Sequence, residues 1–488
     1  MQSEWSTGVA PSRLAEQSIG DVVQLEAQIE WLMARLRLAV IFGGNKLTPG
    51  AVAYPSRNTR SWKSYEAVAA DIAASLRRIG FRHVQLMPDD MHLGERLRRE
   101  DIHMAWLNTG GIQGYNPAAH APAMLEMLGV PYVGHDSLSA TTLDNKHVFK
   151  REAQFAGLPT APFVTWHMAR GPFRPELNRQ FQRAFADYPG PFVVKPVCGR
   201  ASLHVHVVDD RSALAGAIDD VYRATENLVL VEKYLAGREF CIAVAGPVTA
   251  HCRRLLRGRQ PFAFAALERV LAADERIFTS MDVRPITAER YRFLDPGADA
   301  GLLEQARDIA NQVFLEFNLG SLVRLDLRAD ETGKLFILEA NPKPDLKMPA
   351  ESVTSLIVAG LRDSDMDYED LILSLLADRL DFLLRHRRDS VQHIVELLLG
   401  ARLAKQRSVV EPPRAKPQAA SEAFRLGADA AAAAANSRAA VDLLVAGAGD
   451  ADRTHIGRIT ETATDASLEA LDAVRPPAPA AKQLKFGS

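Results

Sequence analysis

Gly320-Ser-Leu-Val-Arg-Leu-Asp-Leu327 and Leu335-Phe-Ile-Leu-Glu-Ala-Asn-Pro342 are the two stretches that decide the fold of this chain. Apolar and polar residues alternate along both stretches, which is the pattern of half-buried β-strands. Asp330-Glu-Thr-Gly333 lies between them and has the composition of a turn. The sequence therefore predicts a β-hairpin over residues 320–342.

Charged and amide residues interrupt these strands in pairs. Arg324 and Asp326 are two residues apart, as are Glu339 and Asn341, so each pair shares one face of its strand. Burying carboxylates costs free energy unless a charge neutralises them. Because carboxylate and carboxamide oxygens suit Mg²⁺, we expect Asp326, Glu339 and Asn341 to hold Mg²⁺ that carries nucleotide phosphates. The alternative is a surface hairpin with scattered charges.

Composition indicates a globular protein. The 488 residues are enough for roughly three domains, and the 47% hydrophobic and 24% charged content is that of a folded chain. A net charge of −2 gives no electrostatic field that would attract nucleic acid or an anionic membrane, so neither is expected as a partner. Three cysteines without metal-ligand spacing, and no apolar span or secretion signal, favour a cytoplasmic protein.

The pattern of apolar residues changes along the chain. Strands alternating with helices through the first part predict an open parallel sheet, and the segments after it predict antiparallel α+β units. The last part is rich in Ala and Pro and is expected to be disordered. The predicted boundaries are a helical extension at 1–36, an N-terminal α/β domain at 37–143, a small subdomain at 144–235, a large subdomain with C-terminal helices at 236–405, and a low-complexity tail at 406–488.

Four motifs precede the hairpin in the chain. They are Val130-Pro-Tyr-Val-Gly134, Leu143-Asp-Asn-Lys146, Phe192-Val-Val-Lys-Pro196 and Val229-Leu-Val-Glu-Lys-Tyr-Leu-Ala-Gly-Arg-Glu-Phe240. Together with the hairpin, in this order, they resemble the ATP-grasp ligases, and most closely the D-alanine–D-alanine ligase group. The resemblance implies an α/β protein with an ATP-grasp fold, in which an open parallel α/β domain precedes two α+β subdomains that sandwich ATP.

The resemblance also implies an activity, a set of site residues and an assembly. The activity is ATP-dependent joining of an amino-acid-like carboxylate to an amine through an acyl phosphate, with two Mg²⁺ ions (or Mn²⁺) and a homodimeric protein. Backbone groups around Leu235 would bind adenine. The implied residues are Arg324, Lys195 and Ser202 for catalysis, Lys146, Lys195, Glu232, Lys233, Leu235 and Glu239 for ATP, and Asp326, Glu339 and Asn341 for metal.

The substrate side departs from the family pattern. The loop Phe42–Gly50 lacks the family's glutamate, and Asn341-Pro-Lys343-Pro-Asp345-Leu-Lys347 replaces its glycine- and serine-containing turn. We expect Lys343 and Lys347 to hold an extra carboxylate, and Asp345 and Glu351 to hold a cationic acceptor amine or a basic side chain, unless they are surface charges. We therefore do not expect D-alanyl-D-alanine as the product.

Three alternatives remain open. One is an ordinary D-alanine–D-alanine ligase with an unusual pocket, and another is a nucleotide-binding interaction protein without catalysis. The third concerns Arg253, Arg254, Arg257 and Arg259, which fall where the family has a lid and either clamp an acidic substrate or form a solvated hairpin.

Overall fold

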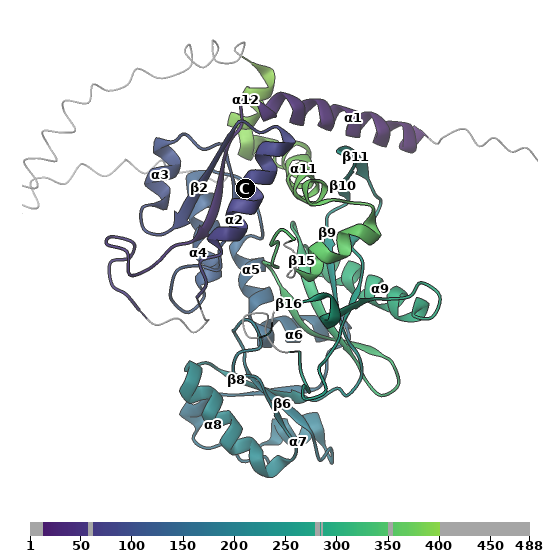
Figure 1. Cartoon of the computed structure of the whole chain (residues 1–488). Helices are drawn as coiled ribbons and strands as arrows, with labels where there is room; N and C mark the ends of the chain where they lie inside the picture. Colours follow the sequence, from purple (N-terminus) through teal and green to yellow (C-terminus); the bar gives the residue numbers. More distant parts are fainter. Residues whose placement is uncertain (1–12, 57–61, 279–283, 285, 350–354, 401–488) are drawn as a thin grey trace, which may run out of the picture. The chain divides into compact units, whose positions relative to one another are not determined.

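The computed structural model describes residues 13–56, 62–278, 284, 286–349 and 355–400 (Figure 1). The predicted tail at 406–488 lies outside the described residues. Among the residues that are described, no helix is both long and apolar enough to cross a bilayer.

The N-terminal part is a four-stranded parallel sheet in the order β2-β1-β3-β4, which confirms the parallel sheet expected from the sequence. Leu38, Ala39, Val40 and Ile41 of β1 are all buried, as expected for a strand covered on both faces. The elements are α1 (Arg13–Met33), β1 (Arg37–Gly43), α2 (Glu66–Ile79), β2 (His83–Asp89), α3 (Leu93–Arg99), β3 (Met104–Asn108), α4 (His120–Leu128), β4 (Tyr132–Val133) and α5 (Ser137–Asp144).

A second sheet has four antiparallel strands in the order β5-β8-β6-β7. Phe181, Phe185 and Phe192 pack in its core, and every residue of β6 is buried. Its elements are α6 (Lys146–Phe155), β5 (Phe163–Trp166), α7 (Arg179–Phe185), β6 (Phe192–Pro196), β7 (His206–Val208), α8 (Leu214–Thr225) and β8 (Val229–Lys233).

A third, six-stranded sheet carries the predicted hairpin. Its order is β14-β13-β9-β15-β16, with β12 also paired to β9, and β15 and β16 are antiparallel as predicted. A register shift between Asp326 and Leu327 marks a bulge in the hairpin. The elements are β9 (Glu239–Ala245), β12 (Phe262–Ala263), β13 (Leu267–Arg269), β14 (Tyr291–Phe293), α9 (Ala300–Glu316), β15 (Val323–Ala329) and β16 (Leu335–Asn341).

C-terminal helices pack against the earlier elements. The long helix α11 contacts both α2 and the separate hairpin of β10 and β11, and Leu371, Ile372 and Leu376 of α11 are buried. These remaining elements are β10 (Val248–His251), β11 (Arg254–Arg257), α10 (Leu356–Ala359), α11 (Tyr368–His386) and α12 (Gln392–Leu399). Short 3₁₀ turns occur at Pro117–Ala119, Met168–Arg170, Arg211–Ala213, Ala288–Arg290, Gly360–Ser364 and Arg388–Val391.

Candidate active site

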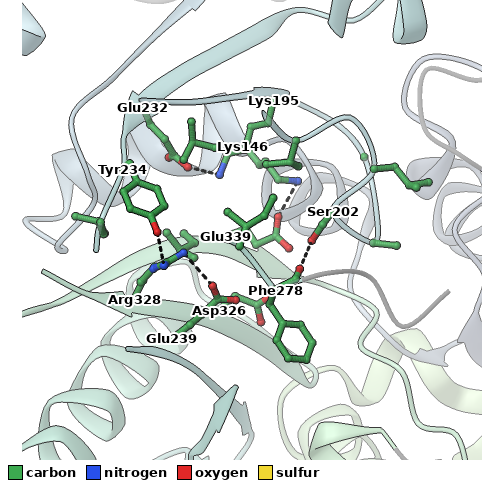
Figure 2. Close-up of a pocket in the computed structure, with 18 of the residues that line it drawn as sticks. Lys146, Lys195, Ser202, Glu232, Tyr234, Glu239, Phe278, Asp326, Arg328 and Glu339 are labelled. Carbon is green, nitrogen blue, oxygen red and sulfur yellow. Dashed lines mark hydrogen bonds and ion pairs between the residues drawn. The ribbon is translucent and has the colours of Figure 1, made fainter. Parts of the chain in front are cut away.

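A cavity lies between the second and third sheets, and side chains from both sheets line it (Figure 2). It brings together residues that are far apart in the sequence and were predicted separately. The predicted residues in its lining are Lys146, Lys195, Ser202, Glu232, Lys233, Leu235, Glu239, Asp326 and Glu339. A second cavity adjoins the first and shares Ser202, Asp326 and Glu339 with it, and its lining adds Arg324, Asn341, Lys343 and Asp345.

Glu232 is fully buried between two lysines. Lys195 on β6 forms an ion pair with Glu232 on the neighbouring strand β8, and Lys150 Nζ lies 3.2 Å from the other carboxylate oxygen. Burial would raise the pKa of Glu232, but Lys195 and Lys150 outweigh it and lower that pKa. The sequence prediction missed Lys150. Its position one helical turn after Lys146, on the same face of α6, was the available signal.

Lys146 begins α6 and points into the cavity. Asn145, not Lys146, caps this helix, since its side chain accepts hydrogen bonds from the backbone of His147 and Val148. Lys146 is buried, and its Nζ lies 2.8 Å from Glu339 Oε2, so it is not an exposed charge at a helix end. Burial would raise the pKa of Glu339, yet Lys146 and Lys195 hold that pKa at about 2.

Two arginines hold Asp326. Arg324, on the same face of β15, donates from Nε and Nη2 to its two carboxylate oxygens at 2.7 and 3.0 Å. Arg269 on β13 lies 2.9 Å from Asp326 Oδ2 and also donates to Glu239 Oε1 at 3.1 Å. Arg269 was missed from the sequence because its two acidic partners lie on other strands of the sheet.

Glu239, which the resemblance assigns to ATP binding, already has two partners. Arg269 contacts one of its carboxylate oxygens, and Arg328 donates to the other at 3.3 Å. Arg328 also donates to the hydroxyl of Tyr234 at 3.0 Å (Figure 2), and the next residue, Leu235, is buried and lines the cavity. Neither Arg328 nor Tyr234 was assigned a role from the sequence.

The loop 198–202 forms one edge of the cavity. Gly199, Arg200, Ala201 and Ser202 line it, and the Ser202 hydroxyl donates to the carbonyl oxygen of Phe278 at 3.0 Å. Ala201 and Ser202 have φ values of +61° and +52°, a left-handed conformation that is uncommon for residues with a Cβ. This short stretch of unusual backbone lines the same cavity as Lys146 and Lys195.

Of the predicted substrate residues, Glu351 lies outside the described residues, and the other three differ in whether they line a cavity. Lys343 and Asp345 line the second cavity, together with Lys63 and Tyr65 from the loop before α2. Lys347 lines neither cavity, so the expectation that it holds substrate is not supported.

The oxygen-bearing residues expected to bind metal converge in the second cavity. Asp326 pairs with Glu339 across the hairpin, and Arg324 pairs with Asn341. Among the described residues, no group of three or more His, Cys, Asp or Glu side chains is placed for a metal ion. The set here instead consists of two carboxylates and one carboxamide, whose hard oxygen donors fit Mg²⁺. In this structure both carboxylates are paired with cationic side chains, Asp326 with Arg324 and Arg269, and Glu339 with Lys146.

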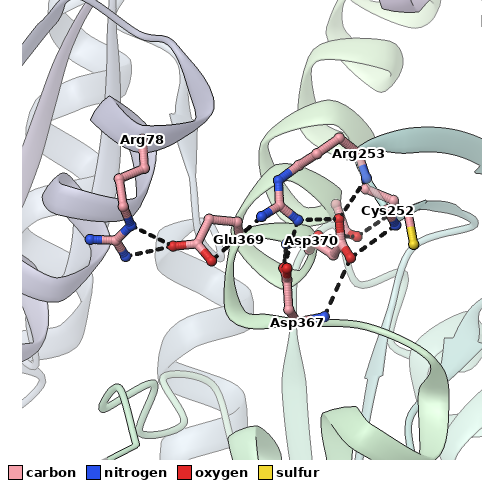
Figure 3. Close-up of polar contacts among 8 residues, drawn as sticks. Arg78, Cys252, Arg253, Asp367, Glu369 and Asp370 are labelled. Atoms are coloured by element: carbon pink, nitrogen blue, oxygen red, sulfur yellow. Dashed lines mark hydrogen bonds and ion pairs between the residues drawn. The ribbon is translucent and has the colours of Figure 1, made fainter.

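Two of the four arginines expected at a lid, Arg253 and Arg257, contact helix α11 or its N-cap instead, and Figure 3 shows Arg253. Arg253 donates to Asp367, the N-cap of α11, and to Asp370 of α11 at 2.6 Å each, and Arg257 forms an ion pair with Asp381. Arg254 lies 3.1 Å from Glu26 of α1, and Arg259 is exposed. None of these four lines either cavity. The expectation of a substrate clamp is therefore not supported, whereas Arg253, Arg254 and Arg259 are exposed, as expected for a solvated hairpin.

Comparison with known proteins supports one family. Residues 153–377 match the family described as D-ala D-ala ligase C-terminus. The chain is 28% identical over 290 residues to D-alanine–D-alanine ligase A of Bradyrhizobium diazoefficiens, covering 59% of this chain and 69% of that protein. It is 23% identical over 347 residues to D-alanine–D-alanine ligase of Pelotomaculum thermopropionicum, covering 70% and 96%.

Solved structures agree in fold. D-alanyl-alanine synthetase A from Vibrio cholerae matches with a TM-score of 0.52 and 16% identity, covering 71% of this chain and 99% of that one. D-alanine–D-alanine ligase from Bacillus anthracis complexed with ATP matches with a TM-score of 0.50 and 18% identity, covering 72% and 98%. With the three sheets and the cavity between two of them, the solved structures show that the chain has the ATP-grasp fold, and its sequence is similar to those of D-alanine–D-alanine ligases.

Proposed function

We propose that this protein is an ATP-dependent ligase that joins an amino-acid-like carboxylate to an amine and releases ADP and phosphate. The observation that carries the proposal is the convergence on adjoining cavities of Lys146, Lys195, Arg324, Asp326 and Glu339. Cations for a polyphosphate and oxygen ligands for its metal are both present there, and this combination suits phosphoryl transfer.

The chemistry proceeds in two steps. A carboxylate is a poor acylating agent, so its oxygen first attacks the γ-phosphorus of ATP, and the bond from that phosphorus to ADP breaks. The amine nitrogen then attacks the acyl carbon, the carbon–nitrogen bond forms, and inorganic phosphate leaves with the electrons of its carbon–oxygen bond. The proton lost by the amine passes to phosphate or water.

The ion pairs in the site suggest how its cations act. Lys146, Lys195 and Arg324 now neutralise Glu339, Glu232 and Asp326. When MgATP binds, we expect these cationic side chains to contact the phosphates, because Mg²⁺ would replace them as the partner of the Asp326 and Glu339 carboxylates. Bound Mg²⁺, for which we propose two ions with Mn²⁺ as a substitute, would neutralise charge on the phosphates. Arg324, with its planar fork of donors, suits the transferring phosphoryl group.

We place the nucleoside between β8 and β9. The backbone near Leu235 would contact adenine, and Glu232 and Lys233 would lie at the edge of the base. Glu239 would accept hydrogen bonds from the ribose hydroxyls. The ATP complex reported for the Bacillus anthracis protein supports an ATP ligand for this fold. Because both Glu239 oxygens now accept from arginines, ribose binding would require one of these contacts to open.

A second candidate is ordinary D-alanine–D-alanine ligation. The names of the relatives from Bradyrhizobium and Pelotomaculum favour it. The lining of the second cavity favours a different substrate, since Lys63, Lys343 and Asp345 occupy it. A nucleotide-binding protein without catalysis is the least supported, because such a protein has less need of the metal-binding oxygens.

A panel assay tests this function. ADP release is measured with MgATP and single amino acids or pairs, including D-alanine alone, and products are identified by mass. We expect an amide product with a pair other than two D-alanines. Dipeptide formation from D-alanine alone would establish the second candidate, and ATP binding without any amide product would contradict the ligase proposal.

A further inference from the structure

One arginine lines both cavities and has as yet no part in the proposed reaction. Arg269 on β13 lies 2.9 Å from Asp326 and 3.1 Å from Glu239, and only 9% of its side chain is exposed. Asp326 is the residue proposed above for the metal, and Glu239 is the residue proposed for the ribose. Both acidic partners of Arg269 therefore have a proposed role toward MgATP.

Each of these two carboxylates also has an arginine of its own. Arg324 donates to Asp326 at 2.7 and 3.0 Å, and Arg328 donates to Glu239 at 3.3 Å. Neither carboxylate would therefore lack a cationic partner without Arg269. Among the residues that the structure describes, this group holds three arginines and two carboxylates, so one positive charge is in excess. A buried charge in excess costs free energy unless a ligand of opposite charge compensates it.

The guanidinium of Arg269 lies between the proposed ribose and metal positions. Its Nη1 contacts Glu239 and its Nη2 contacts Asp326, whereas its buried Nε has no hydrogen-bond partner among the described residues. The guanidinium carbon lies 5.1 Å from the centroid of the Phe278 ring, and the Phe278 carbonyl accepts from Ser202 (Figure 2). Phe278 and Ser202 also line both cavities. The planar donor fork of Arg269 is thus positioned at the junction of the two cavities.

Resting on the ligase function proposed above, we propose that Arg269 is a further catalytic residue, whose guanidinium donates to the γ-phosphate of ATP during its transfer. When Asp326 ligates Mg²⁺ and Glu239 accepts from ribose, Arg269 exchanges its two carboxylates for γ-phosphate oxygens. The γ-phosphate is the one it contacts, because the substrate carboxylate attacks at the junction of the cavities.

The role of Arg269 in this step is electrostatic. A carboxylate oxygen of the substrate bonds to the γ-phosphorus, the bond from that phosphorus to ADP breaks, and its electron pair stays on ADP. Arg269 forms no covalent bond and loses no proton. Its donors stabilise negative charge on the oxygens of the phosphoryl group as it moves.

Binding of nucleotides with and without a γ-phosphate tests this contact independently of turnover. Calorimetry on the full-length chain gives the affinities for MgADP and for the magnesium complex of adenylyl imidodiphosphate, a non-hydrolysable ATP analogue. We expect Arg269→Met to weaken binding of the analogue by about tenfold or more and binding of MgADP by less than about threefold. Arg269→Lys should retain part of the affinity for the analogue, because lysine keeps the charge but lacks the planar fork.

Kinetics with a matched control separates a catalytic role from a structural one. We expect Arg269→Met to lower kcat about a hundredfold, with KM for the amine nearly unchanged and the fold retained by circular dichroism. Arg238→Met is the control, because Arg238 likewise bridges two carboxylates, Glu268 and Asp299, but lines neither cavity. It should leave kcat and the ratio of the two nucleotide affinities unchanged. If Arg269→Met does not fold, Arg269→Lys carries the same test, with a greater loss of affinity for the analogue than for MgADP.

The outcomes distinguish this inference from the ligase function. Equal losses of affinity for both nucleotides in the Arg269 variants, or an unchanged kcat, would overturn the inference while leaving the ligase function intact. Selective loss of the analogue in a protein that forms no amide would support the phosphate contact and contradict ligation. Failure of the wild-type protein to bind either nucleotide would contradict both.

Discussion

At the scale of single residues, the site is a set of carboxylates that each have cationic partners. Glu232 lies between Lys195 and Lys150, and Asp326 lies between Arg324 and Arg269. A buried charge that loses its partner is costly, and that cost exceeds what the pair itself contributes. This property makes it possible to separate residues that act in catalysis from residues that hold the site together.

Asp326→Asn tests the metal and arginine roles. The substitution keeps the shape of the side chain but removes the charge that Arg324 and Arg269 contact, and a carboxamide is a weaker ligand for Mg²⁺. We expect turnover to fall on the order of a hundredfold or more, with the fold retained by circular dichroism. Glu331→Gln, on the exposed turn of the same hairpin, is the control. Normal turnover of Asp326→Asn would contradict the metal assignment.

Glu232→Gln tests the buried triad. It leaves Lys150, which is fully buried, and Lys195 without their shared carboxylate. The free energy of unfolding should fall by about 3–5 kcal/mol in urea titrations, as for other buried pairs that lose one partner. The exposed substitution Glu331→Gln should change it by less than about 0.5 kcal/mol. Equal stability of the two variants would mean that the lysines do not depend on Glu232.

At the scale of elements, helix α11 connects two parts of the molecule (Figure 3). It begins with a capping box, in which Asp367 accepts from the Asp370 N–H and Asp370 accepts from the Asp367 N–H. Asp370 also accepts from the backbone of Cys252 and Arg253, and Arg78 of α2 pairs with Glu369. The start of this helix therefore fastens both the β10–β11 hairpin and the N-terminal domain.

Asp370→Asn should weaken this junction without touching the chemistry. The variant loses a charged cap and charge-assisted hydrogen bonds in a buried position, so we expect stability to fall by about 2–4 kcal/mol. KM for ATP should remain unchanged, because Asp370 lines neither cavity. Asp363→Asn, in an exposed position just before α11, serves as the control. A raised KM for ATP would show that the junction influences the nucleotide site.

The end of β2 carries a carboxyl group with a pH-dependent effect on stability. Burial raises the pKa of Asp89 to about 6, although a hydrogen bond from Thr109 lowers it. Because the folded pKa exceeds the unfolded one, the stability that Asp89 contributes is present below pH 3.8 and lost as pH rises through about 6.

Asp89→Asn should therefore become progressively more favourable than the wild type as pH rises. Between pH 5 and pH 8 we expect its relative free energy of unfolding to increase by about 1–2 kcal/mol in denaturant titrations. The exposed Asp187→Asn should show no such trend. A difference between Asp89→Asn and wild type that does not depend on pH would contradict the raised pKa.

The sequence predicted elements better than contacts between them. Period-two alternation located β15 and β16, and the alternation of strands with helices predicted the parallel sheet, because such patterns are local. The acidic partners of Arg269 and Lys150 lie on strands distant in sequence, so no local pattern could reveal these ion pairs. Lys347 resembled its neighbour Lys343 in the sequence, yet only Lys343 faces the cavity, since loop geometry decides where each side chain points.

At the scale of the whole molecule, the described elements separate three tasks. The second and third sheets enclose the cavity proposed for ATP, and the loop at the carboxyl edge of the first sheet contributes to the adjoining cavity. Helix α11 packs against α2 and β4 of the N-terminal part and against β10. In the proposed ligation, the amine would attack the acyl carbon where the two cavities meet. The shared residues Asp326 and Glu339 mark that place.

Transfer of oxygen from the carboxylate substrate to phosphate tests the central claim most directly. Substrate acids labelled with ¹⁸O in the carboxylate are incubated with MgATP and amines, and the released phosphate and amide are analysed by mass spectrometry. An acyl phosphate predicts one ¹⁸O atom in inorganic phosphate for each amide formed, with ADP as the other product. Amide formation with unlabelled phosphate, or ATP hydrolysis without any amide, would contradict the account.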